Sequence, residues 1–153
     1  MNARMGHPAF LVPGAMEPLV ALGKAIKEVP GVPVKLLELL HLRASQINGD
    51  SANVDRHPRL ARAAGETSEE RLLAVAAWRK TPYFTDAERA ALALTEAVTR
   101  IDDRPDPVSD EIWDEAAKHF SEQELAAIVL SIGTVNLWNR LHVATGQVAN
   151  PDS

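Results

Sequence analysis

ELLHLRASQINGDSANVDRH, residues 38–57, joins helical spacing of apolar residues to a dense run of ionisable and amide side chains. Gly49 follows an asparagine here, and both residue types tolerate the left-handed backbone conformation that closes a helix. Asp50 and Ser51 come next and are residue types that favour the first position of a new helix. We therefore predict a helix, a tight corner and a second helix. The apolar face of the first helix is carried by Leu37, Leu40, Ala44 and Ile47.

This helix–corner–helix carries the candidate site residues. Glu38 belongs to the first helix, and Asp50 stands at the corner. Asn53 and His57 are four residues apart and share a face of the second helix. A histidine at such a place can exchange protons near neutral pH. The same positions also have a purely structural interpretation, in which His57 is a surface histidine and Asp50 only a helix cap.

The rest of the chain predicts further helices and contains no alternating strand pattern of useful length. Three Ser/Thr-x-x-Glu pairs are typical of capping boxes at helix starts, namely Thr67–Glu70, Thr85–Glu88 and Ser121–Glu124. The helix after Ser121 is apolar nearly all round, which indicates burial in the core or against another subunit. Trp78 and Trp138 are interpreted as core residues. The predicted fold class is all-α with about six to eight helices.

The domain organisation follows from glycine, proline and polar residues near the ends. Residues 1–14 are expected to form an irregular arm, residues 15–146 a single helical domain, and residues 147–153 a frayed tail. A chain of 153 residues suits one domain with a real core. No secretory signal and no apolar run of membrane-spanning length is present, so we expect a cytoplasmic protein with no membrane partner.

Composition excludes several kinds of chemistry. The chain has no cysteine, so it has no disulfide, thiolate nucleophile or thiolate metal site. Its formal net charge is −5 and no basic patch stands out, which argues against nucleic acid as a partner. Glu38 and His41 form a single Glu-x-x-His pair, a unit that di-iron helical bundles use in two copies with extra carboxylates. With one copy only, we expect no metal and no cofactor.

Taken together, the chain resembles the carboxymuconolactone decarboxylase and alkylhydroperoxidase D family. The similarity spans roughly residues 15 to 145 and rests on an ordered set of motifs. These are LRASQING at 42–49, AWR at 77–79, FTDAERAAL at 84–92 and NLWNR at 136–140. The resemblance implies an all-helical fold and assembly into homo-oligomers, from dimers to hexamers.

The resemblance also implies an active site of a glutamate, a Cys-x-x-Cys pair and a histidine that reduces peroxides. The glutamate corresponds to Glu38 and the histidine to His57, whereas Asp50 and Asn53 stand at the two cysteine positions. Thiol peroxidase chemistry needs one thiolate to attack the peroxide and a second thiol to resolve the sulfenic acid. Neither Asp nor Asn can do this, so we expect no thiol peroxidase activity.

Three functions remain open on the sequence. The first is a ligand-binding or structural oligomer with a pocket lined by Glu38, Asp50, Asn53 and His57 for a small molecule. The second is a cofactor-free acid–base enzyme of the decarboxylase type, in which His57 or Glu38 transfers a proton. There Arg43 or Arg140 would hold a substrate carboxylate. The third is a metal or small-ligand site at Glu38, His41, Asp50 and His57.

Overall fold

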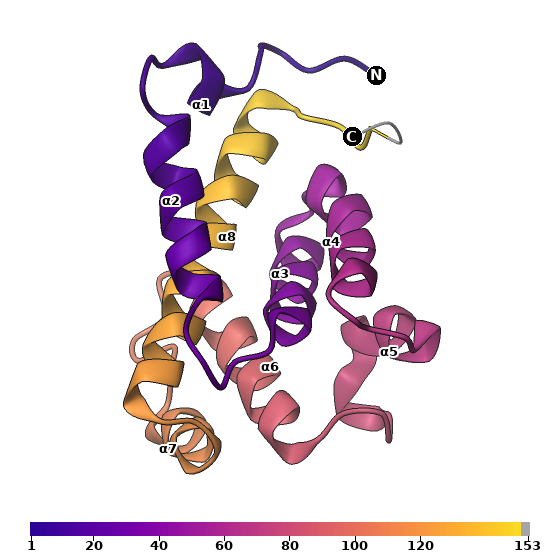
Figure 1. Ribbon diagram of the computed structural model, residues 1–153, viewed down its shortest axis with the longest axis vertical. Helices are drawn as coiled ribbons and strands as arrows, with labels where there is room; N and C mark the ends of the chain where they lie inside the picture. The colour runs from indigo at the N-terminus through magenta and orange to yellow at the C-terminus, as the bar shows by residue number, and fades with distance from the viewer. Residues whose placement is uncertain (151–153) are drawn as a thin grey trace.

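The computed structural model describes residues 1–150, and these form an all-helical fold without strands (Figure 1). The elements in chain order are α1 Pro8–Leu11, α2 Met16–Lys27, α3 Val34–Asn48, α4 Ser51–Ala63, α5 Glu69–Ala74, the 3₁₀-helix η1 Val75–Lys80, α6 Asp86–Thr99, α7 Asp110–His119 and α8 Glu122–Thr145. The all-α prediction is thus confirmed, with eight α-helices in the described residues. Residues 151–153 of the predicted tail lie outside this range. No helix among residues 1–150 is long and apolar enough to cross a membrane.

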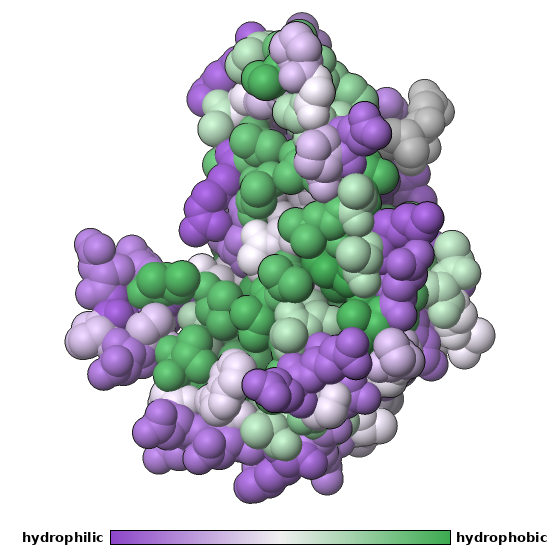
Figure 2. Space-filling view, turned by 60° about the vertical axis from the view of Figure 1, so that its left-hand side comes forward, coloured by the Kyte–Doolittle hydropathy of each residue, from purple (hydrophilic) through white to green (hydrophobic). Residues whose placement is uncertain are grey.

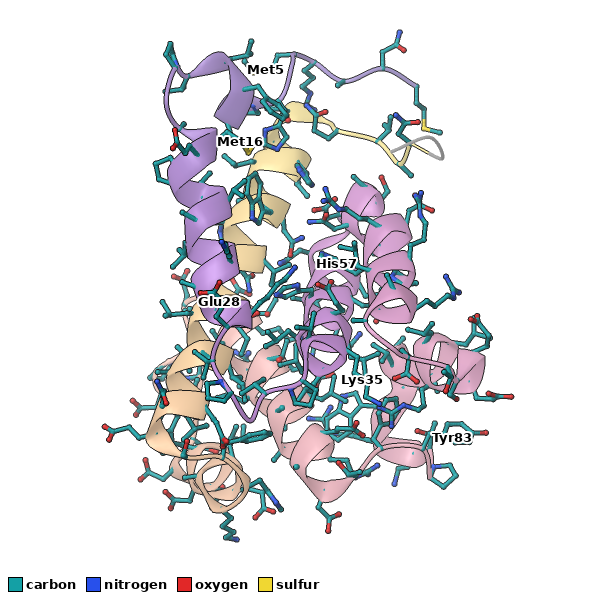
Figure 3. The ribbon with its side chains drawn as sticks, in the orientation of Figure 1. Met5, Met16, Glu28, Lys35, His57 and Tyr83 are labelled. Atoms are coloured by element: carbon teal, nitrogen blue, oxygen red, sulfur yellow. The ribbon has the colours of Figure 1, made fainter. Side chains whose placement is uncertain are left out.

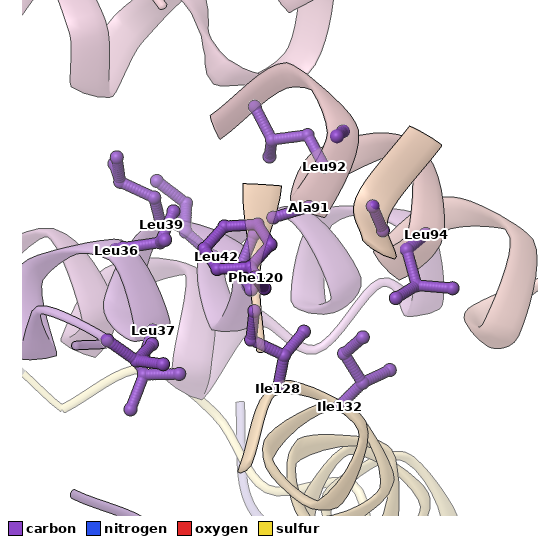
Figure 4. Packing of buried hydrophobic residues seen from close by; sticks show 14 of the residues in the cluster. Leu36, Leu37, Leu39, Leu42, Ala91, Leu92, Leu94, Phe120, Ile128 and Ile132 are labelled. Atoms are coloured by element: carbon purple, nitrogen blue, oxygen red, sulfur yellow. The ribbon is translucent and has the colours of Figure 1, made fainter. Parts of the chain in front are cut away.

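The central helix is α3, which packs against α4, α6 and α8. Its leucines share one apolar cluster with residues of α6 and α8 (Figure 4). Leu37, Leu92 and Ile128 of this cluster are fully buried. Burying these side chains provides the main driving force for folding. The packing holds α3 in place from three sides, so its polar residues are held at fixed positions.

The predicted helix starts are mostly confirmed. Thr85 and Ser121 each form a complete capping box with the glutamate three residues on. The predicted box at Thr67–Glu70 is wrong, because the N-cap of α5 is Ser68, whose hydroxyl accepts a hydrogen bond from Arg71 N. The irregular stretch predicted for residues 1–14 contains one helical turn, α1, capped by the Nδ1 atom of His7.

An ion-pair cluster around the buried Glu96 ties α3 to η1 and α6. The carboxylate of Glu96 accepts hydrogen bonds from Arg43 and the indole of Trp78, and it also pairs with Arg79. Burial by itself would raise the pKa of Glu96, but the arginines and the indole outweigh it and hold that pKa below its usual value. Arg43 is therefore committed to the structure of the core.

Candidate functional site

The corner between α3 and α4 brings the candidate residues together. Gly49 has φ 67°, the left-handed conformation that ends α3, and Asp50 then caps α4 through a hydrogen bond from Asn53 N. The chain reverses within these residues, so α4 lies beside α3 (Figure 1). As a result His57 meets Glu38 across the two helices, with Nδ1 of the imidazole 2.7 Å from Oε2 of the carboxylate.

The protonation of this pair follows from its surroundings. Burial alone would raise the pKa of Glu38, but the imidazoles of His41 and His57 outweigh it and hold that pKa well below its usual range. Glu38 is therefore an ionised carboxylate that only accepts hydrogen bonds, so Nδ1 of His57 donates. Burial outweighs the opposing effect of Glu38 and lowers the pKa of His57, which favours the neutral ring, in which Nε2 carries a lone pair. This Nε2 is buried and has no hydrogen-bond partner among residues 1–150.

Two cationic or basic groups complete the surroundings of Glu38. The Nζ atom of Lys27 on α2 lies 3.5 Å from Oε1, and Nδ1 of His41 lies 3.6 Å from Oε2. The other ring nitrogen of His41 is hydrogen-bonded to the hydroxyl of Ser131 on α8. The His41 and His57 rings face each other edge-on, with centroids 4.9 Å apart. Glu38 is thus the negative centre around which the basic side chains gather.

Asp50 belongs to a separate network. Its Oδ2 accepts hydrogen bonds from Nδ2 of Asn139 and Nδ1 of His142, and both donor–acceptor distances are 2.8 Å. The Nε2 atom of His142 is in turn 3.1 Å from Nε2 of His7, which fastens the N-terminal arm to α8. Burial by itself would raise the pKa of Asp50, yet the donors from His142, Asn139 and Asn53 outweigh it and lower that pKa. The residue therefore joins the corner, the last helix and the arm.

Both networks border one cavity of about 620 Å³ between α2, α3, α4, α8 and the arm. This volume lies within the range typical of small-molecule sites. Four of the five histidines of the chain line it: His7, His41, His57 and His142. Figure 3 labels three residues of the wall, with Met16 and Glu28 near the two ends of α2 and His57 on α4.

Apolar side chains make up most of the remaining wall, namely Phe10, Leu19, Val20, Leu60, Val135 and Trp138. Lys24 and Lys27 at this wall pair with Glu28 and Glu38 respectively. Arg56 also lines the cavity, and its charge contributes to the low pKa of His57. The site therefore combines an apolar body with basic groups concentrated around one carboxylate.

The site residues predicted from the sequence fall into two groups, those that line the cavity and one that does not. Glu38, Asn53 and His57 line the cavity, whereas Asp50 is buried behind the wall and reaches it only through His142. The four-residue metal cluster considered on the sequence is therefore wrong in including Asp50.

Two arginines and one tryptophan lie elsewhere than the sequence predicted. Arg43 and Arg140 do not line the cavity, so neither is placed to hold a substrate there, and Arg56 is the guanidinium at the wall. Trp138 lines the cavity instead of lying in the core. His7 and His142 carry no local sequence signal, since only the docking of the arm on α8 brings them to this place.

Comparison with known proteins identifies the family. The model of the carboxymuconolactone decarboxylase family matches residues 13–97, more than half of the chain. The chain belongs to this family. The uncharacterised protein YdfG of Bacillus subtilis (strain 168) is 37% identical over 112 residues, which cover 73% of this chain and 74% of YdfG.

Solved structures of similar proteins support the same assignment. A protein of unknown function from Agrobacterium tumefaciens, ATU0492, for which an AhpD-type antioxidant role has been suggested, has a TM-score of 0.87 at 32% identity. The match covers 97% of this chain and 99% of that one. The debrominase Bmp8, in complex with 2,3,4-tribromopyrrole, matches 93% of this chain and 74% of its own with a TM-score of 0.82. At 20% identity it shares the fold alone. This carboxymuconolactone decarboxylase family member contains no cysteine anywhere in its sequence.

Proposed function

We propose that this protein binds a small, largely apolar molecule whose O–H or N–H group donates a hydrogen bond to Nε2 of His57. One observation carries the proposal: His57 lines a mostly apolar cavity, and its ring nitrogen Nε2 is buried without a hydrogen-bond partner among residues 1–150. A buried polar atom without a partner costs about 1 to 3 kcal/mol. A ligand that supplies the missing donor recovers this free energy and is favoured over an apolar ligand of the same shape.

The carboxylate of Glu38 supports this role of His57. It holds Nδ1–H of the ring and so fixes which nitrogen carries the lone pair. The dimensions of the cavity suit a ring system with substituents, larger than a water molecule and smaller than a peptide. Bmp8 shows that this fold is compatible with a complex of a small halogenated ring that carries an N–H group.

A matched pair of probes tests the proposal. 2-Naphthol and 2-methylnaphthalene have nearly the same shape, but only the first donates a hydrogen bond. We expect 2-naphthol to bind about tenfold more tightly, the value of one buried hydrogen bond, with affinity measured by fluorescence titration. In His57→Phe the preference should disappear while 2-methylnaphthalene still binds. Equal affinity of the two probes for the unaltered protein contradicts the proposal.

The proposal includes the absence of thiol peroxidase activity, because Asp50 and Asn53 supply no sulfur. Purified protein with hydrogen peroxide and dithiothreitol should consume peroxide no faster than the buffer does. The double variant Asp50→Cys with Asn53→Cys restores the two thiols at the corner, and we expect it to form a disulfide and gain some peroxidase activity. Peroxide turnover by the unaltered protein would overturn this part.

A second candidate function is acid–base catalysis without a cofactor. It is favoured by the hydrogen-bonded pair of Glu38 and His57, since a carboxylate that orients an imidazole is a recurring device of general bases. In this case His57 would move a proton on the bound molecule. If His57→Phe turns over an identified substrate as fast as the unaltered protein does, the histidine is not the base.

We also propose that the protein self-associates. Apolar side chains remain exposed on α2 and α8, where Val20, Leu130 and Leu137 are 60%, 50% and 38% exposed. Figure 2 shows apolar residues gathered on the face that α2 brings forward, with polar residues at its margins. A contiguous apolar surface is typical of an interface. Sedimentation equilibrium should give a dimer or a larger assembly, and Leu130→Glu should weaken it. A monomer at high concentration excludes this proposal.

A further inference from the structure

Two ring nitrogens in the wall of the cavity are buried without a hydrogen-bond partner among residues 1–150. They are Nε2 of His57 and Nδ1 of His41, and no other side-chain nitrogen or oxygen in these residues is buried in this way. Both belong to the histidines that surround the carboxylate of Glu38. Because buried polar groups are nearly always satisfied, the orphaned Nδ1 of His41, 3.6 Å from the carboxylate, indicates a missing partner between these two groups.

The geometry of the three side chains matches that of ligands to one metal ion. Glu38, His41 and His57 each offer one ligand atom, and these atoms lie within 4.8 Å of one another. From Oε2 of Glu38 the Nδ1 atoms of His57 and His41 are 2.7 and 3.6 Å away. Two atoms bound to the same ion at about 2.1 Å lie about 3.0 to 3.4 Å apart. In the metal-free protein Nδ1 of His57 donates its proton to Glu38, so a bound ion would displace this proton and the two atoms would separate by a few tenths of an ångström.

The surroundings prepare these groups as ligands. Hydrogen bonding of Nε2 to Ser131 leaves Nδ1 of His41 directed at the carboxylate, and such an outer contact typically orients a metal-binding histidine. The charge of Glu38 is balanced by Lys27, whose side chain is 44% exposed and can swing into solvent.

We propose that Glu38, His41 and His57 form a binding site for one divalent first-row transition metal ion, such as Zn²⁺ or Fe²⁺. Two imidazoles with one carboxylate suit these ions rather than Mg²⁺ or Ca²⁺, which prefer oxygen ligands alone. Three protein ligands leave further coordination positions, and the cavity lies beside them. Metal binding is independent of the proposed function, in which Nε2 of the metal-free His57 accepts a hydrogen bond.

The experiment is a titration of the chelator-treated protein with Zn²⁺ alone, followed by calorimetry, and with Co²⁺, followed by its visible absorption. We expect one ion per chain and a Co²⁺ spectrum of a site with nitrogen ligands. His41→Ala should weaken binding by about 100-fold or more, since loss of even an outer contact to a metal ligand costs 10- to 100-fold. His142→Ala is the matched control, because it removes another histidine of the cavity that lies outside the cluster.

Lys27→Met gives a test of opposite sign. It removes the ammonium group that competes with the ion for Glu38, so it should tighten Zn²⁺ binding, whereas a nonspecific surface site would not respond. Circular dichroism establishes that each variant is folded, and His57→Gln serves as the second ligand variant if His41→Ala does not fold. No binding at about 0.1 mM Zn²⁺, well above the micromolar Kd of a weak site, overturns the inference. Binding that His41→Ala or His57→Gln leaves unchanged overturns it as well. Neither outcome affects the naphthol test of the proposed function, which uses chelator-treated protein.

Discussion

The replacement Asp50→Ala should destabilise the protein well beyond the loss of a helix cap. The cap itself, a hydrogen bond from Asn53 N, contributes about 1 kcal/mol. The change also removes the acceptor of two buried donors, Nδ2 of Asn139 and Nδ1 of His142. Each donor left without a partner costs about 1 to 3 kcal/mol. Both costs should lie near the lower end of this range, because His142 borders the cavity and Asn139 keeps its hydrogen bond to Ser45. Together with the cap, we expect a total loss of about 3 to 4 kcal/mol in the free energy of unfolding.

Urea unfolding followed by circular dichroism at 222 nm measures this loss. The control is Ser109→Ala, which removes the N-cap of α7, where within residues 1–150 the serine Oγ accepts only from Ile112 N. It should cost about 1 kcal/mol. If Asp50→Ala costs no more than Ser109→Ala, the hydrogen bonds from Asn139 and His142 to Asp50 contribute nothing to stability, contrary to this prediction.

Three further changes test other parts of the structure. Gly31→Ala should cost more stability than Gly65→Ala, by about 1 kcal/mol. Both glycines have positive φ, but only at Gly31 does a new Cβ collide with Glu124, the glutamate of the α8 capping box. Equal losses of unfolding free energy in urea contradict this prediction. Burial and His142 lower the pKa of His7, so unfolding takes up a proton below the unfolded value near 6.5 and stability falls as the pH drops through this window. The fall between pH 7 and 5 should be smaller in His7→Phe, and an unchanged pH profile of the unfolding free energy counts against it. Glu96→Gln leaves buried arginine charge unbalanced and should cost about 3 kcal/mol without changing 2-naphthol affinity; a loss of binding instead would place this residue in the site.

The sequence by itself determined the elements and the corner. Helical spacing of leucines, a glycine with positive φ at the end of α3 and an aspartate that caps α4 all act within a few residues, so they can be read locally. The resemblance carried by LRASQING, with the cysteine positions taken by Asp50 and Asn53, also needed no coordinates. The family assignment and the all-α fold were correctly predicted on these grounds.

Only the tertiary structure decided how the polar residues are grouped. Asp50 is seven residues from His57, yet it is hydrogen-bonded to His142 on α8, 92 positions away. His57 is instead hydrogen-bonded to Glu38. Such pairings depend on how α2, α3 and α8 pack, because side chains on the same helix can point into different networks. Because the sequence has only one Glu-x-x-His pair, it predicted that no metal is bound. The fold adds His57 to that pair and leaves two of the ring nitrogens without hydrogen-bond partners among residues 1–150. Sequence spacing specifies which residues share a helix face, but the buried surroundings that set their charge and their partners exist only once the helices have packed.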